Sequence, residues 1–290
     1  MSQSFTANHH NSLSDATALR RKVLVTGAAG NIGSYFAGHS HDKYALTLMV
    51  HDNDEEAKKL EQFGEVVTGD ITDLEQMKQL CQGMDVVVHL AADPSPSATW
   101  DSIRELNIEG TYNVFVAAKA AGCRRVVYAS SIHAVSGYPA DVQVKTSEPV
   151  NPGDLYGVSK CFGEALGRYM AEQENLSVIA IRIGSFQPIE SVRKESGIGM
   201  VDAWVSQRDL NQLICKCIDA ADIKFAIFHG LSDNRFKRLD ISDAKELVGY
   251  APEDDASKEI PQVKELELNQ KVGAHSMQDG GQKSGLREEI

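Results

Sequence analysis

Short apolar runs recur through the first half of the chain, and segments of helical length separate them. The runs cover residues 23–25, 45–50, 65–68 and 85–92, and a further one at 124–131 ends in two serines. Strands that alternate with helical segments indicate a parallel sheet with crossover connections. The pattern therefore predicts an α/β fold built on a parallel sheet.

The first apolar run leads directly into a glycine-rich turn. Residues 22–33 read KVLVTGAAGNIG, with glycines at positions 27, 30 and 33. A strand, a glycine turn and a helix start can hold a pyrophosphate on backbone N–H groups and the helix dipole. The spacing G-x-x-G-x-x-G is a variant of the dinucleotide fingerprint, and an ordinary strand-to-helix turn is the alternative. We predict a Rossmann-type doubly wound parallel sheet with a small C-terminal substrate-binding part.

Two acidic residues follow the next strands at positions suited to a dinucleotide. Asp52 comes 19 residues after Gly33, near the spacing of about 20 expected for the acid that binds the adenosine ribose. A carboxylate there repels the 2′-phosphate of NADP, so NAD is the predicted cofactor. His51 and the lack of an arginine keep NADP as the alternative. Asp70 follows the third strand, where an acid can hydrogen-bond the adenine amine.

A tyrosine and a lysine four residues apart carry the predicted acid–base chemistry. Tyr156 and Lys160 lie in LYGVSK, and residues four apart on a helix share a face. The ammonium favours the phenolate and is expected to lower the tyrosine pKa from about 10 toward neutrality. Ser131, 25 residues upstream, can hold the substrate oxygen whose proton the tyrosine takes. The set suits oxidation of an alcohol or reduction of a carbonyl, whereas a solvated lysine beside a half-buried tyrosine is the ordinary alternative.

Together these motifs resemble the extended short-chain dehydrogenase/reductase superfamily, which includes NAD-dependent epimerases and dehydratases. The matching segments run in the family's order over residues 22–190 and are TGAAGNIG, GDITD, HLAA, NIEGTYNV, YASS, YGVSK and Arg182-Ile183-Gly184. Within that superfamily the chain is similar to uronate dehydrogenases through ASSIHAVSGYP, LYGVSKCFGE, RIGS and DAWVSQRDL.

The resemblance implies a role for each matched residue. Catalysis would rest on Ser131, Tyr156 and Lys160. Cofactor contacts would come from Gly27, Gly30, Asn31, Ile32, Gly33, Asp52, Asp70, Ile71, Leu90, Ala91, Ala92, Asn107, Tyr156, Lys160 and Ser185. Substrate contacts would come from Ser131 and His133. Ser95, in a loop that could close over the substrate, and Arg193 are further candidates.

Two positions depart from the uronate dehydrogenase pattern. Ile132 stands where the family has an amide, and Gly199 precedes Met200 where the family has its carboxylate-binding arginine. Arg193 lies seven residues before Met200 and is the predicted substitute for that arginine. If Arg193 does not reach the substrate, a neutral sugar is expected instead of a uronic acid.

Length and composition predict one folded domain between two polar ends. The chain has 290 residues, of which 42% are hydrophobic, enough for the core of a single α/β domain. We expect a disordered leader at 1–21, a Rossmann-like domain at 22–253 whose substrate-binding part is mainly 185–253, and a polar, disordered tail at 254–290. The short stretch after Gly184 indicates a small free substrate rather than a nucleotide-sugar.

Charge and cysteine content exclude several classes of function. Binding to nucleic acid or an anionic membrane would need a basic face. The net charge is −12 and the sequence shows no such face, so neither partner is expected. The five cysteines form no C-x-x-C pair, which favours the reducing cytoplasm. No histidine or cysteine pattern indicates a metal site. Members of the superfamily commonly dimerise through the tyrosine-bearing helix, so a homodimer is expected.

The sequence therefore predicts an NAD-dependent oxidoreductase. Its expected reaction is oxidation of a small free sugar, a uronic acid or an aldose, at C1 to the lactone, with Tyr156 as general base. The main alternative is an epimerase or reductase of the same superfamily that acts on another small sugar or carbonyl. A third reading, a non-enzymatic NAD(H)-binding protein, would not need the set Ser131, Tyr156 and Lys160.

Overall fold

The computed structural model describes residues 20–52 and 55–264, and a parallel sheet of seven strands forms its centre. The strands are β1 (Lys22–Thr26), β2 (Ala45–Val50), β3 (Glu65–Thr68), β4 (Val86–His89), β5 (Arg125–Ser131), β6 (Ser177–Ile183) and β9 (Phe225–Gly230). Their order is β3-β2-β1-β4-β5-β6-β9, and all pairs are parallel. This is the doubly wound arrangement that the sequence predicted.

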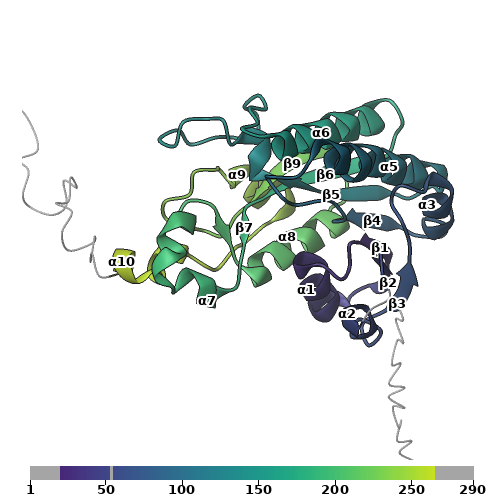
Figure 1. The fold of residues 1–290 in the computed structure, drawn as a ribbon, viewed down its shortest axis with the longest axis horizontal. Coiled ribbons are helices and arrows are strands. Elements are labelled where there is room, and N and C mark those ends of the chain that lie inside the picture. Colours follow the sequence, from purple (N-terminus) through teal and green to yellow (C-terminus); the bar gives the residue numbers. More distant parts are fainter. Residues whose placement is uncertain (1–19, 53–54, 265–290) are drawn as a thin grey trace, which may run out of the picture.

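Helices cover both faces of the sheet. The helices between the strands are α1 (Asn31–Ser40), α2 (Glu55–Lys58), α3 (Leu74–Leu80), α4 (Trp100–Ser102), α5 (Gly110–Ala120), α6 (Leu155–Glu172) and α8 (Gln207–Asp219). A π-helical segment, Ile103–Glu109, joins α4 to α5. Figure 1 shows α3, α5 and α6 on one side of the sheet and α1 and α8 on the other. The seven-stranded sheet is therefore the middle of three layers (Figure 1).

Alternating strand residues fill the two cores between these layers. In β1, Val23 and Val25 pack in the core on the side of α1 and α8, whereas Leu24 packs in the core under α3, α5 and α6. The alternation follows from the pleat, which points successive side chains to opposite faces. Because both faces are covered, the strands read as continuous apolar runs rather than as an alternating pattern.

The strand order reverses between β1 and β4, which lie side by side in the sheet. Crossovers lead to opposite sides from this point, so the loops after the two strands separate and leave a crevice at their carboxyl ends. Ligands of open α/β sheets bind at such a switch point. The glycine turn after β1, the segment after β4 and the serines that end β5 all meet at this edge.

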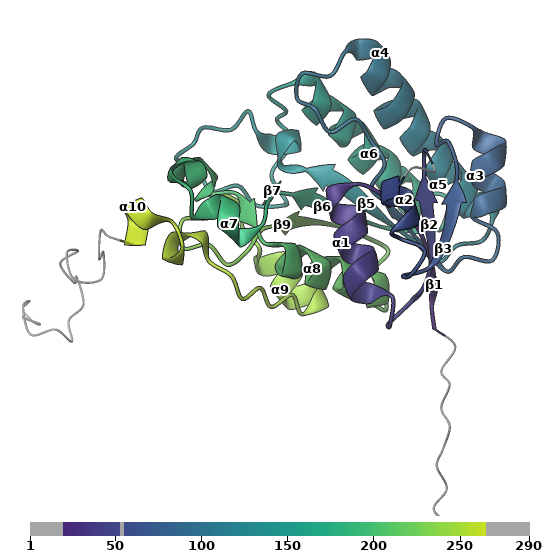
Figure 2. The ribbon, with the colours of Figure 1, turned by 60° about the horizontal axis from the view of Figure 1, so that its bottom comes forward.

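The C-terminal part adds short elements beyond the carboxyl ends of β5 and β6. They are β7 (Ser185–Phe186), α7 (Ile189–Val192), a 3₁₀ turn at Glu195–Met200, β8 (Trp204–Val205), α9 (Ser242–Val248), a 3₁₀ turn at Ala256–Lys258 and α10 (Pro261–Lys264). Strands β7 and β8 pair in parallel. Figure 2 shows α7, β7 and α10 together at one end of the molecule.

The packed fold extends past residue 253, where the sequence predicted a disordered tail to begin. Ala256 and Ile260 are fully buried and form a small core with Val192 and Trp204. Two apolar residues, Ala256 and Ile260, are enough to pack this short segment against Trp204. A segment with so few apolar residues looks polar by composition, so the sequence argument did not predict that it packs. The predicted leader and the rest of the predicted tail lie outside the described residues, apart from Arg20 and Arg21. No helix in the described ranges is long and apolar enough to cross a membrane.

Candidate active site

The glycine turn after β1 brings backbone very close to backbone. Gly27 has φ of +69°, and a Cβ atom there would lie 2.8 Å from the Ala91 nitrogen. A Cβ on Gly33 would lie 2.5 Å from the Gly27 oxygen. Gly30 caps α1 in extended conformation, and its N–H donates to the Gly27 carbonyl at 3.1 Å. The turn is therefore compact and leads into the N-terminus of α1, where Asn31 and Ile32 follow.

A cavity of about 340 Å³ opens beside this turn at the ends of β2, β3 and β4. It is lined by Gly27, Met49, Val50, His51, Gly69, Asp70, Ile71, Ala91, Ala92 and Leu106. The predicted adenosine contacts Asp70 and Ile71 thus meet the glycine turn in one cavity. Asp52 is exposed at the end of β2 and is not among the lining residues, whereas its neighbour His51 is.

A second cavity of the same size, about 340 Å³, contains the predicted catalytic residues. Its lining includes Ile32, Leu90, Ala92, Pro94, Ala129, Ser130, Ser131, Ile132, His133, Tyr156, Lys160, Ile183, Gly184, Ser185 and Phe186. Ser131 ends β5, and Tyr156 and Lys160 lie in the first turns of α6. Residues far apart in the chain therefore meet because α6 packs over the end of β5. Ala92 lines both cavities, so the two adjoin.

Lys160 is buried, and its ammonium has a defined position. Its Nζ donates to the Ala129 carbonyl at 2.9 Å and lies 5.4 Å from the centroid of the Tyr156 ring. Burial lowers the pKa of Lys160 to about 8, because desolvation disfavours the charged form. The lysine is still mostly protonated at neutral pH, so the cavity contains one cation next to the tyrosine.

The Tyr156 phenol differs from the prediction in its pKa. Burial raises that pKa, a hydrogen bond with Ser131 lowers it, and the charges of Asp154 and Asp93 raise it further. The sequence predicted that Lys160 would bring the pKa toward neutrality. The structure corrects this, because desolvation of a phenolate in a largely enclosed site is the dominant effect. Ser131 and Tyr156 line the same cavity.

His133 lines the same cavity and is held by a carboxylate. Its Nδ1 lies 2.6 Å from Oδ2 of Asp154, and its ring meets the Tyr156 ring edge to face with centroids 5.4 Å apart. Asp154 also caps α6, since its Oδ1 accepts from the Gly157 N–H at 2.7 Å. The imidazole therefore has a fixed orientation beside the phenol.

Asn107 is fully buried in the π-helical segment and connects two parts of the site. Its Nδ2 donates to the Asp93 carbonyl at 3.0 Å and to Ser159 Oγ at 3.2 Å, and its Oδ1 accepts from the Asp93 N–H at 2.8 Å. Ser159 in turn donates to the Tyr156 carbonyl at 2.7 Å. The asparagine thus joins the segment after β4 to the helix that carries Tyr156 and Lys160.

Comparison with known proteins agrees with this geometry. Residues 23–187 match the model of the NAD dependent epimerase/dehydratase family. The chain belongs to this family. Its members take NAD as cofactor, as the sequence predicted.

Relatives of the chain include several sugar dehydrogenases. The NAD-dependent glucose-6-phosphate dehydrogenase of Haloferax volcanii is 36% identical over 251 residues, which cover 81% of this chain and 94% of that protein. The L-arabinose 1-dehydrogenase (NAD(P)(+)) of the same organism is 35% identical over 256 residues, 81% of this chain and 98% of that protein. A crystal structure of uronate dehydrogenase from Agrobacterium tumefaciens, a tyrosine-to-alanine mutant complexed with NAD, matches with a TM-score of 0.73 at 28% identity, over 90% of this chain and 93% of that chain. The predicted relationship to uronate dehydrogenases is confirmed.

The described residues fit the family's cofactor. The backbone at Gly27 and Gly33 leaves no room for a side chain, as a pyrophosphate cradle requires. The two adjoining cavities offer space for the two halves of a dinucleotide, and each lies within the size range of ligand pockets. Asp70 would hold the adenosine end, and Lys160 and Ser185 would face the nicotinamide end.

Two predicted substrate contacts lie away from the catalytic cavity. Ser95 is exposed, and its backbone N–H donates to Asp93 Oδ1 at 3.0 Å. Arg193 follows α7, its side chain is 55% exposed, and its Nε donates to Glu259 at 2.8 Å. Neither residue is in the cavity lining. The segment after α7 thus directs Arg193 toward Glu259 near the C-terminal 3₁₀ turn rather than toward the catalytic cavity.

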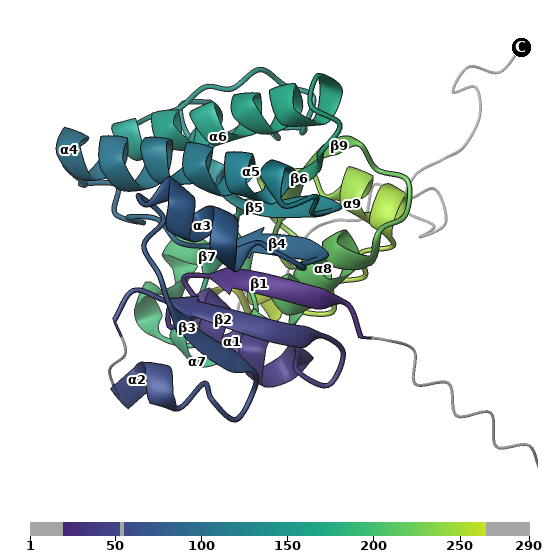
Figure 3. The same cartoon turned by 90° about the vertical axis from the view of Figure 1, so that its right-hand side faces the viewer.

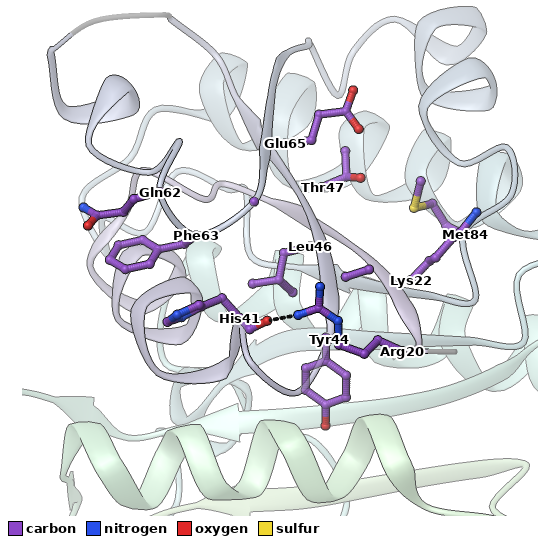
Figure 4. A pocket seen from close by; sticks show the side chains of 12 residues that line it. Arg20, Lys22, His41, Tyr44, Leu46, Thr47, Gln62, Phe63, Glu65 and Met84 are labelled. Atoms are coloured by element: carbon purple, nitrogen blue, oxygen red, sulfur yellow. Dashed lines mark hydrogen bonds between the residues drawn. The ribbon is translucent and has the colours of Figure 1, made fainter. Parts of the chain in front are cut away.

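A larger cavity, of about 470 Å³, lies at the opposite edge of the sheet (Figure 4). It is formed at the amino ends of β1, β2 and β3, where Arg20 donates to the His41 carbonyl at 2.8 Å. Lys22, Tyr44, Leu46 and other residues of these ends complete the lining. Because ligands of this fold bind at the carboxyl ends of the strands, we assign the chemistry to the smaller cavities.

Sequence reasoning missed two residues that organise the site. Asp154 precedes the apolar start of a helix and could have been recognised as an N-cap, but its contact with His133 depends on the tertiary fold. Thr26 ends β1, and its hydroxyl accepts from the Leu90 and Ala91 N–H groups at 3.2 Å each. No local pattern shows these contacts, because the partners lie in the segment after the neighbouring strand β4.

Proposed function

We propose that the chain is an NAD-dependent dehydrogenase that oxidises a small free sugar at C1 to its lactone. The observation that carries this proposal is that Ser131, Tyr156 and Lys160 line one cavity, with the buried Lys160 ammonium 5.4 Å from the centroid of the phenol ring. The names of the relatives, which describe oxidation of sugars, support the same reaction.

In this proposal the protein binds the anomeric hydroxyl and removes its proton. The Ser131 hydroxyl and the Tyr156 oxygen hold the anomeric oxygen between them. Tyr156 takes the hydroxyl proton as the C1–H bond breaks and the C1=O bond of the lactone forms. When bound, NAD⁺ supplies the acceptor for the hydride that leaves C1. The Lys160 ammonium stabilises the phenolate electrostatically, which offsets part of the effect of burial.

The substrate that the site favours is a neutral aldose. Arg193, which would have to bind the carboxylate of a uronic acid, forms an ion pair with Glu259 on the surface. The lining of the catalytic cavity contains no arginine, and Lys160 is engaged with Ala129. A carboxylate or phosphate in this cavity would therefore lack a dedicated counter-charge, which costs binding energy in a partly desolvated site.

The test is NADH formation by purified protein with NAD⁺ or NADP⁺ and a panel of neutral aldoses, uronic acids and sugar phosphates. Turnover of neutral aldoses with NAD⁺ is expected. Turnover restricted to uronic acids would refute the neutral-aldose assignment and imply that another group binds the carboxylate. No NADH with any sugar, despite NAD⁺ binding, would refute the dehydrogenase and favour an epimerase, which shows no net NADH release.

Replacement of Tyr156 tests the assigned base. Tyr156→Phe is expected to abolish turnover, because the variant has no group to accept the proton, while the NAD⁺ dissociation constant stays within about twofold. The matched control is Tyr169→Phe on the same helix, where the side chain is 50% exposed. A Tyr156→Phe enzyme that retains more than a few percent of activity would exclude the phenol as general base.

We also propose a cytoplasmic homodimer. All five cysteines are free thiols, in keeping with a reducing compartment. Tyr112 on α5 and Leu155 and Val158 on α6 are exposed apolar side chains, and these two helices lie side by side (Figure 3). A second copy that buries this surface would remove these side chains from water. Light scattering at micromolar concentration should give the dimer mass.

A further inference from the structure

The carboxylate of Asp154 makes two contacts that serve different purposes. Its Oδ1 accepts the Gly157 N–H at 2.7 Å and so caps the helix that carries Tyr156. Its Oδ2 lies 2.6 Å from Nδ1 of His133, which belongs to the 3₁₀ turn Ile132–Val135 after β5. A cap needs only the first contact. The second one ties the catalytic helix to a ring in the lining of the catalytic cavity.

The second contact determines which nitrogen of His133 carries the proton. An ionised carboxylate only accepts hydrogen bonds, so Nδ1 must be the N–H. In the neutral ring the lone pair is then on Nε2. No hydrogen bond to Nε2 is made by residues 20–52 or 55–264, and 31% of the side chain remains exposed. The imidazole therefore presents an acceptor to a ligand in the cavity.

We propose that Asp154 is a positioning residue for substrate recognition. It holds His133 in the Nδ1–H form, so that Nε2 accepts a hydrogen bond from a second hydroxyl of the sugar whose anomeric hydroxyl lies between Ser131 and Tyr156. The edge-to-face contact of the His133 and Tyr156 rings, with centroids 5.4 Å apart, puts the two groups within the span of one sugar ring. This inference rests on the proposed sugar dehydrogenase activity and adds the group that orients the ring.

Three substitutions separate the two contacts of Asp154. Asp154→Ser keeps a good N-cap but is too short to reach His133. Asp154→Asn keeps the cap through its one oxygen but turns an NH2 donor toward His133 Nδ1, which favours the opposite tautomer. Asp154→Ala removes both contacts. The proposal predicts that Asp154→Ser raises KM for the sugar by about five- to tenfold, the value of one hydrogen bond, with a much smaller effect on kcat.

The stability of the variants and their discrimination between sugars distinguish a positioning role of Asp154 from a structural one. Asp154→Asn should raise KM as Asp154→Ser does, and the thermal midpoint and NAD⁺ affinity of both variants should match the wild type. Deoxy-sugars that lack the contacted hydroxyl should be poor substrates for the wild type but no worse than the parent sugar for Asp154→Ser. If KM in Asp154→Ser is unchanged, or rises only together with a loss of stability, the positioning role is refuted.

The tautomer itself gives a test that does not depend on turnover. Nitrogen-15 NMR of the His133 ring, assigned with His133→Gln and recorded on the neutral ring, should show a protonated Nδ1 and an unprotonated Nε2 in the wild type. Asp154→Ser should shift the ring toward a mixture of tautomers. A wild-type ring protonated at Nε2 alone would overturn the inference even if the sugar activity is found. The expected tautomer without any sugar turnover would refute the proposed function but leave the positioning of His133 intact.

Discussion

The buried ion pair between Glu164 and Arg182, next to the catalytic cavity, gives a prediction about stability. Glu164 on α6 is 4% exposed and binds Arg182 of β6 through two bonds of 2.8 Å each. The Ser130 hydroxyl, in the lining of the catalytic cavity, donates to the same carboxylate at 2.6 Å. Arg182 also lies 3.5 Å from the His229 ring. The substitution Glu164→Gln removes the negative charge and nearly preserves the shape.

The expected loss is large because Arg182 stays charged and buried. Removal of one partner of a buried pair costs about 3 to 5 kcal/mol. The control is Glu172→Gln, on the same helix, whose 3.0 Å pair with Arg168 is largely exposed and worth only about 0.3 to 0.5 kcal/mol. At about 2 to 4 °C per kcal/mol for a domain of this size, the thermal midpoint should fall by about 6 to 20 °C in Glu164→Gln. In Glu172→Gln it should fall by no more than about 2 °C.

Urea and thermal unfolding of the two variants, followed by tryptophan fluorescence, measure this difference. Trp204 is fully buried and Trp100 is 54% exposed, so unfolding changes mainly the Trp204 emission. The double variant Glu164→Gln, Arg182→Met should recover part of the loss, because it removes the unpaired charge. A Glu164→Gln protein as stable as Glu172→Gln would refute the reasoning and mean that the buried guanidinium is satisfied by its other neighbours.

Two further predictions concern the cofactor and pH. Gly27→Ala should weaken NAD⁺ binding at least tenfold in a calorimetric titration, because the new Cβ would lie 2.8 Å from the Ala91 nitrogen at a φ of +69°; unchanged affinity would contradict the close approach. Burial lowers the pKa of His89 to about 3 and of His229 to about 4. These folded-state pKa values lie below the ordinary value of about 6.5, so the unfolded chain binds more protons than the folded protein. The free energy of unfolding therefore falls as the pH decreases from about 6.5 toward 4, and the loss at pH 5 is about 2 kcal/mol per histidine. Urea midpoints at pH 7.5 and pH 5 check this, and His229→Gln should lose part of the pH dependence; an equal dependence in that variant would argue against it.

The sequence by itself determined those features that depend on neighbours along the chain. The glycine turn of Gly27 to Gly33 is local geometry between one strand and one helix. The pairing of Tyr156 with Lys160 follows from a spacing of four on a helix. The apolar runs correctly predicted the parallel sheet, because strands buried on both faces must be apolar throughout.

Only the tertiary structure decided what depends on packing between distant segments. It joined Asp154 to His133, turned Arg193 toward Glu259 and away from the catalytic cavity, and added Ala256 and Ile260 to the core. It also reversed the expected shift of the Tyr156 pKa, since spacing identifies a neighbouring charge but not how much water is excluded around the phenol. Burial and long-range contacts arise when whole elements pack together, and a local pattern does not contain that information.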